Sequence, residues 1–160
     1  MDFTEVFDHI YSFMNKDALG NYRLMLGTDS QIHSDSTIFI TGIVIQRVGK
    51  GAWACFRKVI IPRKMTVLHE RISYETTLTE EVAVLFTPEK INLLVDLVLP
   101  NIYRGSTFTM EGHIDIGAGE RNRTSVYVNE MIARIESLGI EPKIKPDSIA
   151  ASSYANKYTK

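Results

Sequence analysis

The sequence predicts an α/β domain in which helices flank a mixed five-stranded sheet. Two β-branched runs joined by a glycine turn, at 37–48 and 52–61, are typical of a β-hairpin. From residue 66 onward the apolar residues recur at helical spacing, and the later strands at 107–116 and 140–145 alternate with helices. An antiparallel first half followed by βαβ crossovers gives a mixed sheet.

The first half of the chain is predicted to form one helix and then three strands. An amphipathic N-terminal helix lies within residues 1–16, where apolar residues recur at helical spacing. Turn residues at 17–21 lead into a mostly apolar strand at 22–29, which is the pattern of a central strand buried on both faces. The hairpin follows, and Pro62 ends its second strand. We expect these three strands to pair in chain order.

The second half alternates helices with strands. Its predicted helices share a 3.6-residue apolar period and cover 66–86, 89–99, 124–138 and 147–157. Pro88 separates the first two, and Gly139 ends the third. The first two helices provide the crossover that returns the strand at 107–116 to the side of the strand at 22–29. If these strands are parallel neighbours, their carboxyl ends lie at the same edge of the sheet.

The composition indicates one globular domain over residues 1–160, with 44% hydrophobic and 23% charged residues. No apolar run approaches the roughly 20 residues that a membrane span requires, and the acidic N-terminal segment differs from a signal peptide. Cys55 is the only cysteine and cannot form an internal disulfide bond. We therefore expect a cytoplasmic protein without a membrane partner.

Charge and aromatic content do not by themselves predict a polyanionic partner. The formal net charge is −1, so the overall field favours neither sign of ligand. Local basic clusters are interpreted as solvated faces that would permit such a partner; they contain Arg57, Lys58, Arg63, Lys64, Lys143, Lys145, Lys157 and Lys160. Trp53 and Phe56 lie on a predicted strand and are interpreted as core residues rather than as base-stacking residues.

Glu75 lies within the apolar stripe of the helix at 66–86. It is seven residues from both Leu68 and Val82, which places its side chain within about 20° of each of them around the helix. The other acids of this helix are rotated away from the stripe and are expected at the surface: Glu70, Glu80 and Glu81. A buried carboxylate is costly unless it is paired or binds a metal ion, so a salt bridge to a buried Arg or Lys and a metal site both remain open.

Three aspartates have positions that suit a metal site at the same edge of the sheet. Asp29 ends the strand in LMLGTDSQ, and Asp115 ends the strand in GHIDIG. Asp147 begins the last predicted helix, where it is either an N-cap, a further ligand, or both. Oxygen ligands without cysteines favour Mg²⁺ or Mn²⁺. Two such ions about 4 Å apart suit in-line displacement at phosphorus.

These features together resemble the ribonuclease H-like fold. The segments GTDSQ, RISYE, GHIDIG and KPDSIAASSYANK are similar, more closely, to the YkuK-like family of bacterial proteins. The resemblance implies that Asp29, Glu75 and Asp115 are the first-strand, helix and fourth-strand acids of the ribonuclease H pattern. Asp147 matches the last acid of that pattern, although it lies at the entrance of the final helix rather than within it.

The expected function is therefore a divalent-metal-dependent nuclease that hydrolyses phosphodiester bonds in RNA, DNA or their hybrid. Two Mg²⁺ or Mn²⁺ ions would be held by Asp29, Glu75, Asp115 and Asp147. His113, beside Asp115 on its strand, and His33, in the loop after Asp29, are candidates for proton transfer.

The segment at 113–124 supports a second hypothesis. Its glycines are similar to the phosphate loop of the sugar kinase and actin superfamily, which shares this core fold. The alternative function is thus a nucleotide- or nucleic-acid-binding protein that does not hydrolyse its ligand. Arg121 and Arg123 follow the glycine loop and either contact phosphate or face solvent at a helix start.

Overall fold

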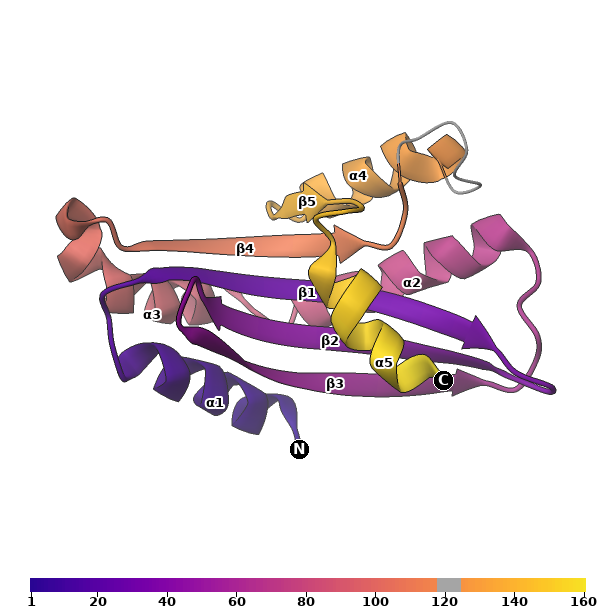
Figure 1. Ribbon diagram of the computed structural model, residues 1–160, viewed down its shortest axis with the longest axis horizontal. Helices are drawn as coiled ribbons and strands as arrows, with labels where there is room; N and C mark the ends of the chain where they lie inside the picture. The colour runs from indigo at the N-terminus through magenta and orange to yellow at the C-terminus, as the bar shows by residue number, and fades with distance from the viewer. Residues whose placement is uncertain (118–124) are drawn as a thin grey trace.

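The computed structural model describes residues 1–117 and 125–160, and its centre is a five-stranded mixed sheet (Figure 1). The spatial order is β3-β2-β1-β4-β5. The strands are β1 (Asn21–Ile32), β2 (Thr37–Arg47), β3 (Gly51–Ile61), β4 (Thr107–Ile114) and β5 (Glu141–Lys143). β1, β2 and β3 pair antiparallel, whereas β4 runs parallel to β1 and β5 parallel to β4. The predicted mixed sheet is confirmed.

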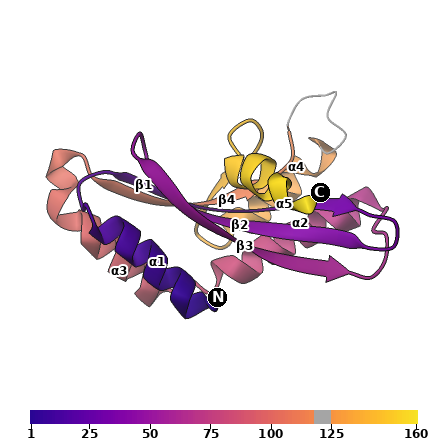
Figure 2. The same ribbon diagram turned by 60° about the horizontal axis from the view of Figure 1, so that its bottom comes forward.

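Helices lie on both faces of this sheet. They are α1 (Phe3–Asn15), α2 (Leu68–Ala83), α3 (Pro88–Val98), η1 (Leu99–Arg104), η2 (Ser125–Tyr127), α4 (Val128–Glu136), the π-helical η3 (Ala150–Ala155) and α5 (Asn156–Thr159). Figure 2 shows α1 and α3 on one side of the sheet and the C-terminal helix on the other. A capping box of Asp2 and Glu5 begins α1, and the Thr87 hydroxyl caps α3.

The main hydrophobic core lies between the sheet and the helices α1, α2 and α3. Alternation along β1 directs Leu24 and Leu26 into this core together with Ile10 of α1 and Leu94 of α3. A second cluster joins α2, α4 and the end of β4, and it consists of Ile72, Ile114, Ile116, Met131 and Ile135. The face that carries Leu24 and Leu26 is therefore buried by four helices.

The opposite face is covered more thinly, and the helices that lie on it among the described residues are η3 and α5. Two glycines allow this segment to lie directly on the strands. A Cβ atom at Gly27 would stand 2.8 Å from the backbone nitrogen of Ala151, and one at Gly42 would stand 2.7 Å from the Tyr154 ring. Figure 1 shows the C-terminal helix crossing in front of β1 and β2 toward β3.

Element boundaries differ from the prediction at the positions that matter most. β1 continues past Asp29 to Ile32, because β2 still pairs with it there. β4 ends at Ile114, so Asp115 is the first residue after the strand. The last helix begins after Ile149 rather than at Asp147. No helix among the described residues has the length and apolar character needed to cross a membrane.

Candidate functional site

Three predicted acids meet at the carboxyl end of the β1–β4 pair. The parallel pairing of these strands ends at Thr28 and Ile114, so Asp29 and Asp115 both follow the last pair. Glu75 comes from α2. This helix is held against β1 by a 2.8 Å hydrogen bond between the hydroxyl groups of Thr79 and Thr28. Asp29, Glu75 and Asp115 are called the acid cluster below.

Asp29 is buried, with 6% of its surface exposed. Its Oδ2 accepts a 2.8 Å hydrogen bond from Nδ2 of Asn156. Burial raises the pKa of Asp29 to about 6; the Asn156 hydrogen bond opposes this, while a hydrogen bond and charge from the adjoining Asp115 carboxyl add to it. The carboxyl groups of Asp29 and Asp115 are therefore direct neighbours, as parallel strands predict.

Glu75 is half-buried. Burial raises its pKa well above the usual value, and the charges of Asp29 and Asp115 raise it further. The Ser30 hydroxyl donates a 2.5 Å hydrogen bond to Glu75 Oε2. Arg71, one turn earlier on α2, lowers this pKa through its charge. Among the described residues no Arg or Lys forms an ion pair with Glu75.

Asp115 completes the acid cluster, with 17% of its side-chain surface exposed. Its Oδ1 accepts a 2.7 Å hydrogen bond from the Ser152 hydroxyl. The Lys145 ammonium lies 3.4 Å from the same oxygen, and 45% of the Lys145 side chain is exposed. Lys145 is the one basic residue that forms an ion pair with the acid cluster within the described part of the chain, and its exposure limits the strength of this pair.

Each acid of the cluster accepts a hydrogen bond from an uncharged side chain: Ser30, Ser152 or Asn156. No sequence motif predicts these donors. Ser152 and Asn156 are four residues apart in the C-terminal helical segment and therefore lie on one side of it. This four-residue spacing is the sequence feature that could have predicted Ser152 and Asn156 as donors. It does so only when the acids that face the helix are already known.

The C-terminal segment is held in place by a polar network that begins at His113, two residues before Asp115, and runs back along β4 and β1 to Glu111 and Arg23. The backbone N–H of Ala150 donates to His113 Nδ1 at 2.9 Å, so the ring proton lies on Nε2 and is donated to Glu111 Oε1, also at 2.9 Å. Arg23 holds Glu111 through two hydrogen bonds of 2.7 and 2.8 Å. Burial alone would raise the pKa of Glu111, but the hydrogen bonds from Arg23 and His113 and the Arg23 charge lower it to about 2.

The two histidines suggested for proton transfer have structural contacts in this arrangement. Both ring nitrogens of His113 are engaged, one by the backbone of Ala150 and one by Glu111. His33 Nε2 lies 2.9 Å from the carbonyl oxygen of Thr159, at the end of α5. Among the described residues neither histidine forms a hydrogen bond with the acid cluster.

Asp147 is not brought into the acid cluster. It is exposed, its backbone N–H donates to the carbonyl of Ile144, and its charge acts on Arg23. Among the described residues the side chain of Asp147 forms no hydrogen bond with the carboxyl groups of the acid cluster. The N-cap interpretation is wrong, because residues 144–147 first form a turn and Ile149 occupies the cap position. Arg121 and Arg123 lie outside the described residues, as does most of the glycine loop.

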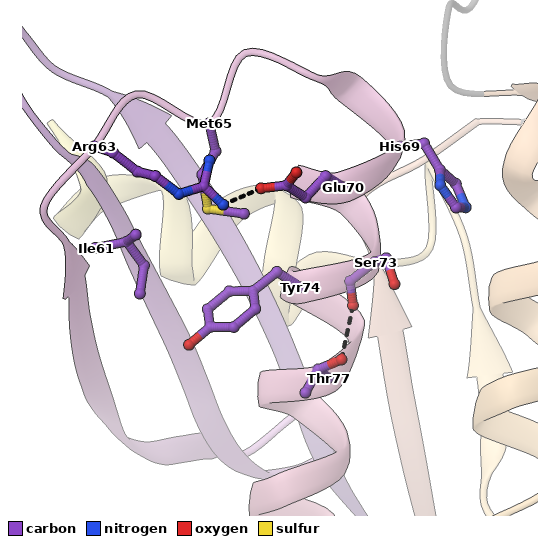
Figure 3. Close-up of a pocket in the computed structure, with 8 residues that line it drawn as sticks. All are labelled: Ile61, Arg63, Met65, His69, Glu70, Ser73, Tyr74 and Thr77. Atoms are coloured by element: carbon purple, nitrogen blue, oxygen red, sulfur yellow. Dashed lines mark hydrogen bonds and ion pairs between the residues drawn. The ribbon is translucent and has the colours of Figure 1, made fainter.

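A separate surface pocket lies on the outer side of α2 (Figure 3). Its lining includes Met65 as a buried residue, together with Tyr74 and Ser73. Arg63 and Glu70 stand at its rim and pair with each other, so their charges cancel. The pocket shares no residue with the acid cluster, and we assign it no role in the proposed chemistry.

The donor chemistry of the acid cluster suits a hard divalent cation. All its ligand atoms are oxygen atoms. The carboxylates repel one another, and a divalent ion would neutralise the negative charge that causes this repulsion. Within the described ranges, no group of three or more His, Cys, Asp or Glu side chains is arranged as a ready-made metal site. The carboxylates instead point to their uncharged donors, so ion binding would require them to reorient.

Comparison with known proteins gives a consistent result. The model of a family described as Ribonuclease H-like matches residues 5–160. A protein of Bacillus subtilis (strain 168) named "Uncharacterized protein YkuK" is 42% identical over 160 residues, which covers 100% of this chain and 92% of that protein. No solved structure matches the chain.

Proposed function

This chain belongs to the ribonuclease H-like family, and we propose that it is a divalent-metal-dependent phosphodiesterase that acts on nucleic acid. The observation that carries the proposal is the acid cluster, in which three carboxyl groups from β1, α2 and the end of β4 share one site, and no buried cation within residues 1–117 and 125–160 neutralises them. A site of this kind, at the carboxyl ends of parallel strands, is suited to ligand binding.

Asp29, Glu75 and Asp115 would hold the Mg²⁺ or Mn²⁺ ions, which we propose to be two in number. When bound, such ions lower the pKa of water and stabilise negative charge on a phosphoryl oxygen. The protein's own contribution is to bring the three carboxyl groups to one place. Ser30 holds Glu75, and the C-terminal segment holds the two aspartates through Ser152 and Asn156, until ion binding reorients them. Asp147 takes no part in this proposal, since its charge acts at Arg23.

Two basic residues beside the acid cluster are suited to receive the substrate phosphate. Lys145 reaches Asp115 from the loop after β5 and is largely exposed. Arg71 lies one turn before Glu75, and its buried Nε has no hydrogen-bond partner among the described residues. A buried donor without a partner is costly, and a phosphate oxygen would satisfy it. We therefore assign phosphate binding to Arg71 and Lys145. We assign no proton transfer to His113, because both of its ring nitrogens are already engaged.

A nuclease panel with Mg²⁺ or Mn²⁺ tests the proposal. Its substrates are single- and double-stranded RNA and DNA, an RNA–DNA hybrid and a branched junction. We expect the protein to cleave at least one of them, and Asp115→Asn to remove the activity. Asp147→Asn, which changes an exposed aspartate outside the acid cluster, is the matched control and should cleave as the unmodified protein does.

The same panel separates the proposal from its alternative, a protein that binds nucleotide or nucleic acid at this sheet end without hydrolysis. Equal residual cleavage by the protein and by Asp115→Asn would indicate a contaminating nuclease and contradict the proposal. Calorimetry with ATP then tests the alternative: ATP binding that survives Asp29→Asn supports a non-hydrolytic nucleotide-binding protein.

A further inference from the structure

We propose that β3 and the last turn of α5 form a docking surface for single-stranded nucleic acid, which leads the strand to the acid cluster. The surface consists of Phe56 and Lys58 on β3 together with Lys157 and Tyr158 on α5, and is called the Lys58 surface below. This inference rests on the proposed phosphodiesterase function and specifies its substrate class.

The strand register places the Lys58 surface beside the acid cluster. Asp29 pairs with Ile40 of β2, and Ile40 pairs with Lys58 of β3. Directly paired residues lie on the same face of a sheet, and two strand spacings correspond to about 10 Å. A backbone of two or three nucleotides spans this distance, so one strand can contact both places.

The last turn of α5 bridges the two places. Asn156 donates its hydrogen bond to Asp29 on one side of the helix, and the Tyr158 ring stacks on Phe56 on the other, with centroids 4.2 Å apart. Lys157 lies between them in sequence and is exposed. Figure 1 shows the end of α5 lying over the strands between β1 and β3.

The aromatic pair remains open to solvent. Phe56 is 43% exposed and Tyr158 is 38% exposed, so the predicted core role of Phe56 is wrong. The physical reason is alternation along β3: Trp53 faces α1 and stacks on His9, whereas Phe56 faces the thinly covered side. Exposed aromatic rings provide the stacking platform that unpaired bases use.

The charge of the Lys58 surface also favours a nucleic acid. Neither β3 nor residues 148–160 contains an Asp or Glu, although the chain has 19 acidic residues. The neighbouring Arg57 and Arg63 pair with the α2 acids Glu81 and Glu70. Lys58 and Lys157 are exposed and form no ion pair within residues 1–117 and 125–160. Unpaired lysines beside stacked rings match a polyanion with accessible bases, which is a single strand rather than a duplex.

Fluorescence anisotropy with labelled single-stranded RNA and DNA oligonucleotides tests this surface. EDTA keeps the oligonucleotides intact during the titration. We expect Lys58→Ala to weaken binding several-fold. The number of counterions released on binding, measured as the slope of log affinity against log salt concentration, should fall by about one. Tyr158→Leu should weaken binding at least about fivefold through lost stacking, and Tyr158→Phe should restore it.

Two matched control variants lie away from the Lys58 surface. Lys50 is an exposed lysine in the β2–β3 turn, and Tyr103 is 83% exposed in η1. Lys50→Ala and Tyr103→Ala should bind as the unmodified protein does. Circular dichroism and thermal unfolding of every variant confirm that a change in binding is not a loss of folding.

Three results would overturn the inference: no binding of any single strand, unchanged binding by both Lys58→Ala and Tyr158→Leu, or equal competition by duplex DNA or polyglutamate. These results are distinct from failure of the proposed function. That failure would appear as absent metal-dependent cleavage while single-strand binding and its dependence on Lys58 and Tyr158 persist.

Discussion

Asp29 and Glu111 are both buried acids on adjacent, parallel strands, yet their environments act on them in opposite directions. Glu111 is 3% exposed and Asp29 6%. Arg23 and His113 compensate Glu111 and bring its pKa to about 2. Asp29 has an amide for its hydrogen-bond donor and a second carboxyl group for a neighbour, and its pKa rises to about 6. Both side chains are buried, so the opposite directions of their pKa shifts come from their charged partners.

The two acids also differ in what their hydrogen-bond partners hold in place. The Glu111 network ends on the backbone of Ala150, where it anchors the C-terminal segment. That segment then presents Ser152 and Asn156, and no cation, to the acid cluster. The Glu111 carboxylate is thus compensated within the fold, whereas the carboxyl groups of the acid cluster are the ones that we propose as ligands of a divalent ion.

The largest expected effect is on catalysis. We predict that Glu75→Gln lowers metal-dependent cleavage at least about 100-fold, because it removes one charged oxygen ligand from the acid cluster. The measurement is the initial cleavage rate on the best substrate of the nuclease panel. Glu81→Gln alters an exposed acid of the same helix that pairs with Arg57, and should leave this rate unchanged. Equal rates for both variants would place the ions elsewhere.

Glu111→Gln should cause the largest loss of stability. It removes a buried charge that holds Arg23 and His113, and we expect the free energy of unfolding at pH 7 to fall by about 3 kcal/mol. Because the folded-state pKa of Glu111 is lowered to about 2, this contribution is present above about pH 4.5 and is lost as pH falls toward 2. Urea unfolding at pH 7 and at pH 3 measures both effects; an unchanged midpoint at pH 7 would contradict the account.

Asp29→Asn should act on stability in the opposite direction. The raised folded-state pKa means that the folded protein binds protons more tightly than the unfolded chain, so its stability falls as pH rises from about 4 to about 6. Without divalent ions, the variant should gain about 2 kcal/mol relative to the unmodified protein between pH 4 and pH 8. Thermal unfolding in EDTA at these pH values measures the gain, and Asp147→Asn should show none.

Removing a single uncharged donor should have the smallest effect. Ser152→Ala deletes one hydrogen bond to Asp115 and should cost about 1 kcal/mol of stability. We also expect cleavage to slow by less than about tenfold, since the carboxylates remain. Ser153→Ala alters the exposed neighbouring serine and is the control for both measurements. A loss of cleavage as large as that of Glu75→Gln would mean that Ser152 itself contacts the substrate or ion.

Much of the fold and the central part of the site follow from sequence patterns. The glycine turn and β-branched runs specify the antiparallel strands, and the helix pair specifies the parallel return of β4. The antiparallel order of the first strands and the parallel return of β4 are sufficient to predict that Asp29 and Asp115 lie side by side. Glu75 needed the helical period as well, because its position relative to Ile72 and Leu78 puts it on the buried face of α2.

The remaining parts depend on where the C-terminal segment lies, and local rules do not determine that. Asp147 was a plausible helix cap because aspartate is a common N-cap residue. Residues 144–147 instead form a turn, and the helix begins after Ile149. The positions of Ser152 and Asn156 follow from tertiary contacts. Gly27 and Gly42 lack a Cβ atom and so let the helix lie close to the sheet, and the Ala150 N–H at its start donates a hydrogen bond to His113. The core prediction for Phe56 is wrong because both faces of β3 carry apolar residues, and the pattern does not indicate which face the helices cover.

We propose above that the acid cluster binds divalent cations. Calorimetric titration of Mn²⁺ at pH 7.5 into the protein, Asp29→Asn and Asp147→Asn tests it most directly. We predict saturable binding to the protein and to Asp147→Asn, and an affinity at least about tenfold weaker in Asp29→Asn, as expected when one ligand of a metal site is removed. Absent binding, or equal binding by all three proteins, would contradict the account.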